Sequence, residues 1–188
     1  VAGVRENGGQ YTHAACWAVA AMAALGPREQ AASWLARLSP VSHTQTSSDV
    51  QRYRLEPYVV AADVYGEPPH VGRGGWSWYT GSAGWWYRVA LESVLGLRVE
   101  NERELIIRPC IPASWPGFRL RYRLPDGVTE CEIQVDNGNG GGSVIAATLD
   151  DDPQTIQAGA ARVVLPAGPG RHSIRVRLGA SPASVPTR

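Results

Sequence analysis

The sequence from Ser82 to Arg108, SAGWWYRVALESVLGLRVENERELIIR, changes its pattern at Gly96. Before this glycine the chain predicts a helix over residues 82–95, which the glycine ends. After it, residues 97–99 and 104–108 are short apolar runs typical of strands. The stretch therefore predicts a helical region followed by a β region, joined near residues 96–102.

Upstream of this junction the pattern is helical. Residues 13–25 are rich in alanine and end at Gly26-Pro27, and residues 28–38 place apolar side chains on one stripe at helical spacing. Residues 47–53 predict a further turn of helix. A proline in the first turn favours another helix over residues 57–65.

Downstream, apolar and polar residues alternate in short runs, and Gly, Asn, Asp and Pro clusters separate the runs. Seven such runs predict an antiparallel β-sandwich. The expected strands are residues 97–99, 104–108, 118–124, 129–135, 143–149, 161–165 and 173–178.

The aromatic residues support the same division, because every Trp, Tyr and Phe lies at or before Tyr122. We expect three parts: helices over residues 1–96, a β-sandwich over residues 97–179 and a flexible tail over residues 180–188. So few helices do not close a standard all-helical core. Two interpretations stay open, namely a C-terminal fragment of a larger enzyme and a complete small α+β protein.

The composition excludes several classes of function. The chain has 188 residues with 18 basic and 17 acidic side chains, so its net charge of +1 argues against nucleic acid as the main partner. Every basic residue is Arg, which excludes mechanisms that need a lysine. The longest apolar run, residues 14–25, is shorter than the ~20 residues of a membrane span, and no signal peptide is expected.

The three cysteines, Cys16, Cys110 and Cys131, are widely spaced and form no CxxC pair. We expect free thiols rather than disulfides, and no metal site.

The segment RENGGQYTH at residues 5–13 is unusual for a purely structural loop. Its glycines permit close approach of the backbone to a ligand, and Glu6 and Asn7 are suited to sugar hydroxyls. His13 lies in the first turn of the following helix, where the helix dipole favours an anion. The alternative is a capped loop with a surface histidine.

A second segment, residues 67–86, combines glycines with four Trp. Flat aromatic faces beside glycines suit stacking on a pyranose ring, which makes Arg73, Trp76 and Trp78 candidates for sugar contacts. Thr80 and Gly81 then begin a helix, and hydroxyls with free backbone N–H groups form a cradle for an anion. The alternative is an ordinary helix cap with buried Trp.

A third candidate is Glu56, which directly precedes Pro57. Its carboxylate suits a helix cap, a lining residue of a sugar site, or both, and we favour the cap.

Four motifs in order carry a family resemblance. They are ENGGQYTHAACW at residues 6–17, LEPYVVAADVY at 55–65, PPHVGRGGWSWYTGSAGWWYR at 68–88 and IIRPCIPASWPGF at 106–118. Together they resemble the inverting glycoside phosphorylases of the cellobiose/chitobiose phosphorylase family. Within it they look most like the C-terminal phosphorylase domain of cyclic β-1,2-glucan synthases and the β-1,2-oligoglucan phosphorylases.

The resemblance implies part of an (α/α)6 barrel followed by a jelly-roll-like sandwich. It also implies that inorganic phosphate attacks a β-glucoside with inversion, which gives α-glucose 1-phosphate. Phosphate is already anionic, so the reaction needs a general acid but no general base.

The substrate that the resemblance implies is therefore a β-glucoside, and in particular a β-1,2-glucan or one of its gluco-oligosaccharides. That reaction uses no cofactor, because inorganic phosphate is the co-substrate. By analogy with these relatives, the chain is expected in the cytoplasm, in a parent that other domains attach to the inner membrane.

The resemblance also implies roles for single residues. His13, together with Thr80 and the Gly81 backbone, matches the phosphate-binding residues, and Glu6 matches a contact to the acceptor sugar. The family's general acid is an Asp upstream of this chain, so we expect no catalytic residue here, no activity of the chain alone and an upstream barrel half as its partner. Ala61-Ala62 stands where some relatives carry a glutamine, which weakens the match on that side of the phosphate site.

Two other classes of function compete with this one. A carbohydrate-binding or accessory module would use the Trp segment and the sandwich to bind glucan without turnover. A complete metal-dependent or acid hydrolase is disfavoured, because the sequence has no HExxH motif and no readable carboxylate pair.

Overall fold

The computed structural model describes residues 1–78, 80–138 and 140–180. The chain divides into two compact units, Val1–Val94 and Leu95–Arg188. The first unit holds the helices and the second most of the strands, so the predicted order of an α region before a β region is confirmed. The (α/α)6 barrel and the jelly roll stay predictions, and the tail predicted for residues 180–188 lies, apart from Ala180, outside the described residues.

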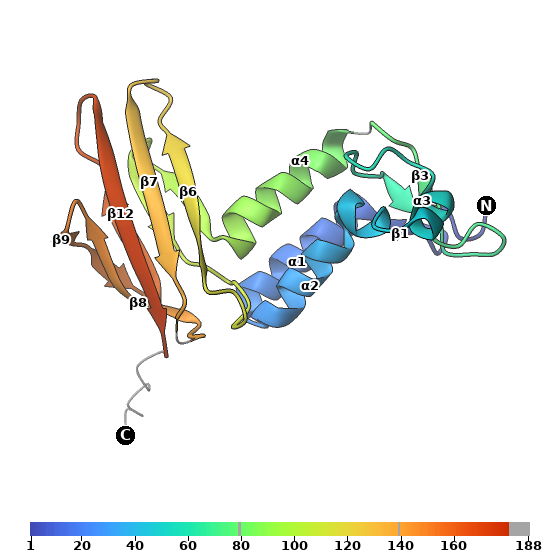
Figure 1. Ribbon diagram of the computed structural model, residues 1–188, viewed down its shortest axis with the longest axis horizontal. Coiled ribbons are helices and arrows are strands. Elements are labelled where there is room, and N and C mark those ends of the chain that lie inside the picture. Colours follow the sequence, from blue (N-terminus) through green and yellow to red (C-terminus); the bar gives the residue numbers. More distant parts are fainter. Residues whose placement is uncertain (79, 139, 181–188) are drawn as a thin grey trace. The chain divides into compact units, whose positions relative to one another are not determined.

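The helices of the first unit begin and end close to the predicted positions (Figure 1). Gly26, with a φ of 106°, ends the first helix, and its N–H bonds to the Met22 carbonyl. The Thr46 hydroxyl caps the third helix by accepting from the Asp49 N–H at 3.2 Å. The helices are α1 (Thr12–Leu25), α2 (Arg28–Arg37), η1 (Pro40–His43), α3 (Ser47–Tyr53), α4 (Thr80–Val89) and the π-helical turn η2 (Ala90–Val94).

Helix α1 packs against both α2 and α4. Cys16 and Val19 of α1 are fully buried, as is Ala31 of α2. The indole N–H of Trp86 in α4 donates to the Leu35 carbonyl of α2 at 3.2 Å. These contacts fix the three helices as one layer of the first unit.

A small antiparallel sheet corrects the prediction of a helix over residues 57–65. It consists of β1 (Gln10–Tyr11), β2 (Asp63–Val64) and β3 (Gly74–Gly75), in that order. Tyr11 pairs with Asp63, which pairs in turn with Gly75. The long-range pairing satisfies backbone groups that a local helix would otherwise have paired, so it overrides the helical signal of the proline.

The second unit contains two sheets, with strand orders β10-β11-β5-β4 and β6-β7-β12-β8-β9. Burial alternates along β7, where Cys131, Ile133 and Val135 are buried between more exposed neighbours. The strands are β4 (Leu97–Glu100), β5 (Glu104–Ile107), β6 (Gly117–Arg123), β7 (Thr129–Asp136), β8 (Ser143–Leu149), β9 (Asp152–Pro153), β10 (Thr155–Gln157), β11 (Ala160–Val164) and β12 (Gly170–Gly179).

One strand pair corrects the prediction of a purely antiparallel arrangement. Strands β7 and β12 run parallel, with Ile133 opposite Ile174. The two strands are separated in sequence by β8 to β11, so no tight hairpin forces them to be antiparallel. Their register brings apolar residues of both strands onto one buried face.

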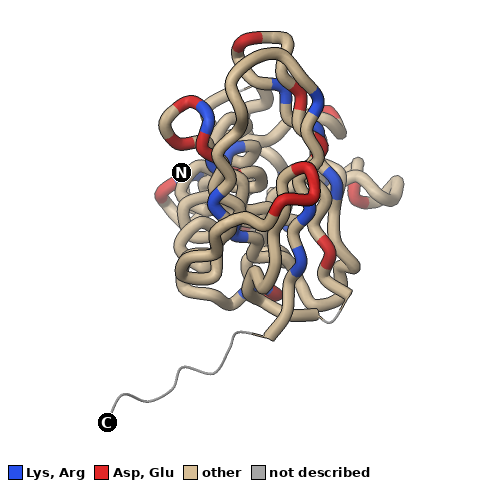
Figure 2. Tube along the Cα trace, turned by 90° about the vertical axis from the view of Figure 1, so that its left-hand side faces the viewer, with Lys and Arg blue, Asp and Glu red and all other residues tan. Residues whose placement is uncertain are grey.

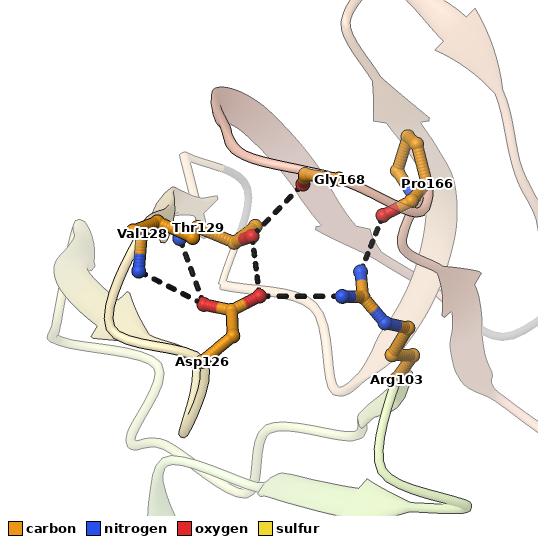
Figure 3. A network of polar contacts seen from close by, with 6 residues as sticks. All are labelled: Arg103, Asp126, Val128, Thr129, Pro166 and Gly168. Atoms are coloured by element: carbon orange, nitrogen blue, oxygen red, sulfur yellow. Dashed lines mark hydrogen bonds and ion pairs between the residues drawn. The ribbon is translucent and has the colours of Figure 1, made fainter.

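A polar network closes the loop ends of the second unit (Figure 3). One carboxylate oxygen of Asp126 accepts the N–H groups of Val128 and Thr129 at 3.0 and 2.9 Å. The other lies 2.6 Å from the Thr129 hydroxyl and 3.2 Å from Nη2 of Arg103, and Nη1 of the same guanidinium donates to the Pro166 carbonyl. The Thr129 hydrogen bond and the Arg103 guanidinium hold the pKa of Asp126 below its ordinary value, with the hydroxyl as the larger cause.

Basic and acidic residues interleave along the chain trace (Figure 2). In the second unit Arg121 and Arg123 both lie near Glu130, and Arg162 contacts Glu104 at 2.7 Å. These charges therefore neutralise one another locally. Among the described residues, no helix is long and apolar enough to cross a membrane.

Candidate functional site

The first turns of α1 and α4 are anchored to two adjacent residues, Ala62 and Ala61. The Thr12 N–H of α1 donates to the Ala62 carbonyl at 2.9 Å, and the Ser82 hydroxyl of α4 donates to the Ala61 carbonyl at 3.1 Å. Both alanines are buried. Two helix N-termini, each with a partial positive charge, consequently lie at one end of the helical layer.

Thr80 and Gly81 begin α4 and are exposed. A Cβ placed on Gly81 would meet no heavy atom within 4 Å, so its backbone borders open space. The N–H groups in the first turn of a helix have no partner within the helix. A hydroxyl beside such N–H groups can bind an anion.

His13 lies in the first turn of α1, inside an aromatic cluster. Its ring stacks on Trp85 with 5.5 Å between the centroids, and Trp17 meets it edge-on at 4.8 Å. Trp85 is four residues after Gly81 and therefore on the same side of α4. The structure thus brings His13 to the side of α4 on which Gly81 lies.

The Nε2 atom of His13 is buried and has no hydrogen-bond partner among the described residues. A buried polar atom without a partner costs free energy, and such atoms are rare in folded proteins. This nitrogen therefore lacks a partner within the described part of the protein, and a polar ligand would supply one.

The Glu6–Asn7 turn is held by backbone contacts. The Gly66 N–H donates to the Gly3 carbonyl at 2.8 Å, and the Gly9 N–H donates to the Arg5 carbonyl at 2.9 Å. A Cβ on Gly66 would lie 2.2 Å from the Gly8 oxygen, so the two loops approach too closely for a side chain. Glu6 and Asn7 are exposed at this fixed turn.

Asp63 is a site residue that the sequence analysis missed. Its side chain is only 1% exposed, and its Oδ2 accepts the Arg5 N–H at 2.9 Å. A Cβ on Gly75, its cross-strand partner, would lie 2.4 Å from Oδ1. The sequence analysis assigned residues 57–65 to a helix and therefore gave Asp63 no such contact. The lone carboxylate directly after the apolar run VVAA did indicate a polar role at this position.

The two predicted Trp contacts lie on an unusual backbone. Trp76 and Trp78 have φ values of 54° and 63°, which bulky residues rarely adopt. The Arg5 guanidinium lies 4.8 Å from the centre of the Trp76 ring, which links this loop to the Glu6–Asn7 turn. Arg73 lies three residues before Trp76, which corresponds to about 10 Å in an extended chain. The Arg73 carbonyl accepts the Tyr65 N–H, and the Arg73 N–H donates to the His70 carbonyl.

A pocket of about 430 Å³ in the first unit lies apart from these residues. Its lining is mostly apolar and includes Val19, Trp34 and Leu38, but neither His13 nor Thr80. We therefore base the candidate site on the helix N-termini and not on this pocket.

The cysteines take no part in this arrangement. None of the three forms a disulfide, and burial raises the pKa of the Cys16 and Cys131 thiols to about 11. Neither thiol is a thiolate near neutral pH. Among the described residues, no group of three or more His, Cys, Asp or Glu could hold a metal ion.

The family model of the glycosyl hydrolase 94 superfamily, catalytic domain, matches residues 1–96. The chain belongs to this superfamily. The match covers the first unit, in which His13, Thr80, Glu6 and Asp63 all lie.

Individual relatives of this glycosyl hydrolase 94 chain are phosphorylases and a glucan synthase. It is 50% identical over 138 residues to the cyclic beta-(1,2)-glucan synthase NdvB of Rhizobium meliloti (strain 1021). The matched stretch covers 73% of this chain and 5% of that protein. It is 32% identical to the N,N'-diacetylchitobiose phosphorylase of Vibrio furnissii, over 72% of this chain and 17% of that protein. The chain thus spans less than a fifth of the length of either relative.

Proposed function

We propose that this chain supplies the phosphate-binding and part of the sugar-binding surface of an inverting glycoside phosphorylase. His13, Thr80 and the Gly81 backbone would bind inorganic phosphate. Glu6, Asn7, Arg73, Trp76 and Trp78 would contact the saccharide. The observation that carries this proposal is the buried, unpartnered Nε2 of His13 beside the start of α4, in the described part of the chain.

The chemistry follows from an anionic nucleophile held at a fixed point. A phosphate oxygen forms a bond to the anomeric carbon of a β-glucoside while the glycosidic C–O bond breaks on the opposite face. The leaving oxygen takes a proton from a general acid, which we place in another part of the polypeptide. The product is α-glucose 1-phosphate, and the arrangement is that of an inverting glycosidase with phosphate in place of water.

We propose a β-1,2-glucan as the substrate because a relative at 50% identity is named as a cyclic beta-(1,2)-glucan synthase. The competing function is a carbohydrate-binding module without turnover. The exposure of Trp76 and Trp78 favours it as the second candidate, since exposed indoles bind sugars in the absence of any chemistry.

The test is phosphorolysis by the full-length protein, followed as release of glucose 1-phosphate from β-1,2-linked gluco-oligosaccharides. We expect His13→Ala to lower kcat/KM for phosphate by about 10²-fold, since it removes one preorganised contact to a charged group. Thr80→Val should have a smaller effect in the same direction. His70→Ala and Thr155→Val are matched controls at exposed positions.

The two candidate functions give different results in this assay. Phosphate-dependent turnover that falls only in the two site variants supports the phosphorylase. Saccharide binding that neither phosphate nor these substitutions affect, without any glucose 1-phosphate, supports the binding module.

A further inference from the structure

The Trp76–Trp78 segment combines backbone strain with exposed rings. Both residues have φ in the left-handed region, which costs a bulky residue of order 1–3 kcal/mol. Their side chains are nevertheless 57% and 64% exposed, so burial of their own rings does not offset this strain. Strained residues of this kind cluster at sites that bind ligands.

Polar and aromatic neighbours fix the Trp78 ring. Its indole N–H donates to Oε1 of Glu56 at 3.0 Å, and Tyr58 meets the ring edge-on with 6.2 Å between the centroids. The backbone N–H of Glu56 itself, followed by the Trp78 indole, lowers the pKa of the Glu56 carboxyl, so this acceptor is ionised at neutral pH. The Tyr58 ring is 71% exposed.

We propose that Tyr58 and Trp78, with Glu56 as the positioning residue, form a stacking platform for a glucosyl unit of a longer gluco-oligosaccharide. This inference rests on the proposed function and extends its sugar site. The platform adds to Trp76, which contacts Arg5 of the Glu6–Asn7 turn. The preferred saccharide is then longer than a disaccharide, because one of its units lies beyond those that contact Glu6.

The chemistry of the platform selects a pyranose. An aromatic face attracts the C–H face of a sugar ring, and the hydroxyl of Tyr58 and the carboxylate of Glu56 are groups that suit sugar hydroxyls. The structure also corrects the interpretation of Glu56 as a helix cap, because no helix begins in the described residues 57–62 that follow it.

The experiment measures saccharide KM for β-1,2-linked glucans of two and six units with the full-length protein. We expect Tyr58→Ala and Trp78→Ala to raise the KM of the hexasaccharide about tenfold, with little change for the disaccharide. Glu56→Ala should have the same effect. Glu56→Gln should restore most of the affinity, since an amide oxygen still accepts the indole N–H. Trp115→Ala, in the second unit, is the matched control.

Two outcomes would overturn the platform. One is an equal change in KM for both saccharides. The other is a lower melting temperature of Tyr58→Ala with unchanged dependence on chain length, which would assign these rings to packing against protein. Trp78→Phe keeps a ring and serves if Trp78→Ala does not fold.

The failure of the proposed function is distinguishable from the failure of the platform. A wild-type protein that releases no glucose 1-phosphate contradicts the phosphorylase. Calorimetric binding of the hexasaccharide then still tests the platform, which requires about tenfold weaker binding by Tyr58→Ala than by the wild type.

Discussion

The two units hold their polar groups in different ways. In the second unit the Asp126 carboxylate uses both oxygens, with partners in its own turn (Val128 and Thr129) and in the turn between β4 and β5 (Arg103). In the first unit the buried Nε2 of His13 has no partner among the described residues, and Asp63 uses its carboxylate to fix a backbone turn. The second unit also has a buried atom without a partner among the described residues, Oδ1 of Asn137, but Nδ2 of the same side chain donates to the Pro112 and Trp115 carbonyls. We therefore assign the polar contacts of the second unit to holding its own loops, and we propose a ligand contact for His13 in the first.

The aromatic residues differ in the same sense. Among the described residues of the first unit, five Trp and Tyr side chains are more than half exposed, namely Trp17, Tyr58, Trp76, Trp78 and Tyr87. The second unit relies on aliphatic residues such as Ile133, Ile174 and Val176, which are buried on its strands. We therefore propose that the second unit serves stability and the first unit ligand contacts, and substitutions can test each proposal.

The largest effect is expected from Ile174→Ala in the second unit. This side chain is fully buried on β12, opposite Ile133 of β7 and Leu149 of β8. Its truncation should lower the free energy of unfolding by about 2–5 kcal/mol, measured by urea denaturation. Ile156→Ala, on the more exposed strand β10, is the control and should change it by less than about 0.5 kcal/mol. If the KM for phosphate rose in the Ile174 variant at a temperature where this variant is folded, the separation between a stabilising second unit and a ligand-binding first unit would be wrong.

A smaller effect on stability, but a larger one on function, is expected from Asp63→Ala. The substitution leaves the Arg5 N–H buried without its acceptor, at a cost of about 1–3 kcal/mol. Hydrogen exchange of residues 5–9 should accelerate, and the saccharide KM should rise roughly tenfold because Glu6 loses its fixed position. Asp63→Asn keeps an acceptor oxygen and should restore both values. Unchanged exchange in Asp63→Ala would show that the carboxylate does not hold this turn.

Local patterns in the sequence predicted most elements of both units. The alanine-rich run with its glycine stop predicted α1, and alternation predicted seven strands of the second unit to within a few residues, but not the short strands β9 and β10. These features depend on neighbours in the chain, which propensity and periodicity describe well. His13, Thr80 and Glu6 stay predictions as ligand contacts, although the structure places His13 beside α4.

The features that sequence reasoning missed depend on distant pairing. Asp63–Val64 forms a strand only because Gln10–Tyr11 and Gly74–Gly75 lie on either side of it. The parallel pairing of β7 with β12 likewise joins residues about 40 positions apart, by their strand bounds. No window of local sequence contains both partners, so the lone carboxylate after VVAA indicated a polar role for Asp63 but not its partner, the Arg5 N–H.

The smallest effect is expected from Asp126→Asn, which tests the polar network of the second unit. Because the folded-state pKa of Asp126 is lowered, chiefly by the Thr129 hydroxyl, its contribution to stability is present above the unfolded pKa of about 3.9. That contribution is lost as the pH falls through the folded pKa. The wild type should therefore lose more stability than Asp126→Asn between about pH 6 and about pH 3, measured as the urea midpoint. Asp152→Asn, on the exposed strand β9, is the matched control. Identical pH dependence of wild type and Asp126→Asn would mean that solvent screens this network, and that the second unit owes its stability to the apolar faces of its strands alone.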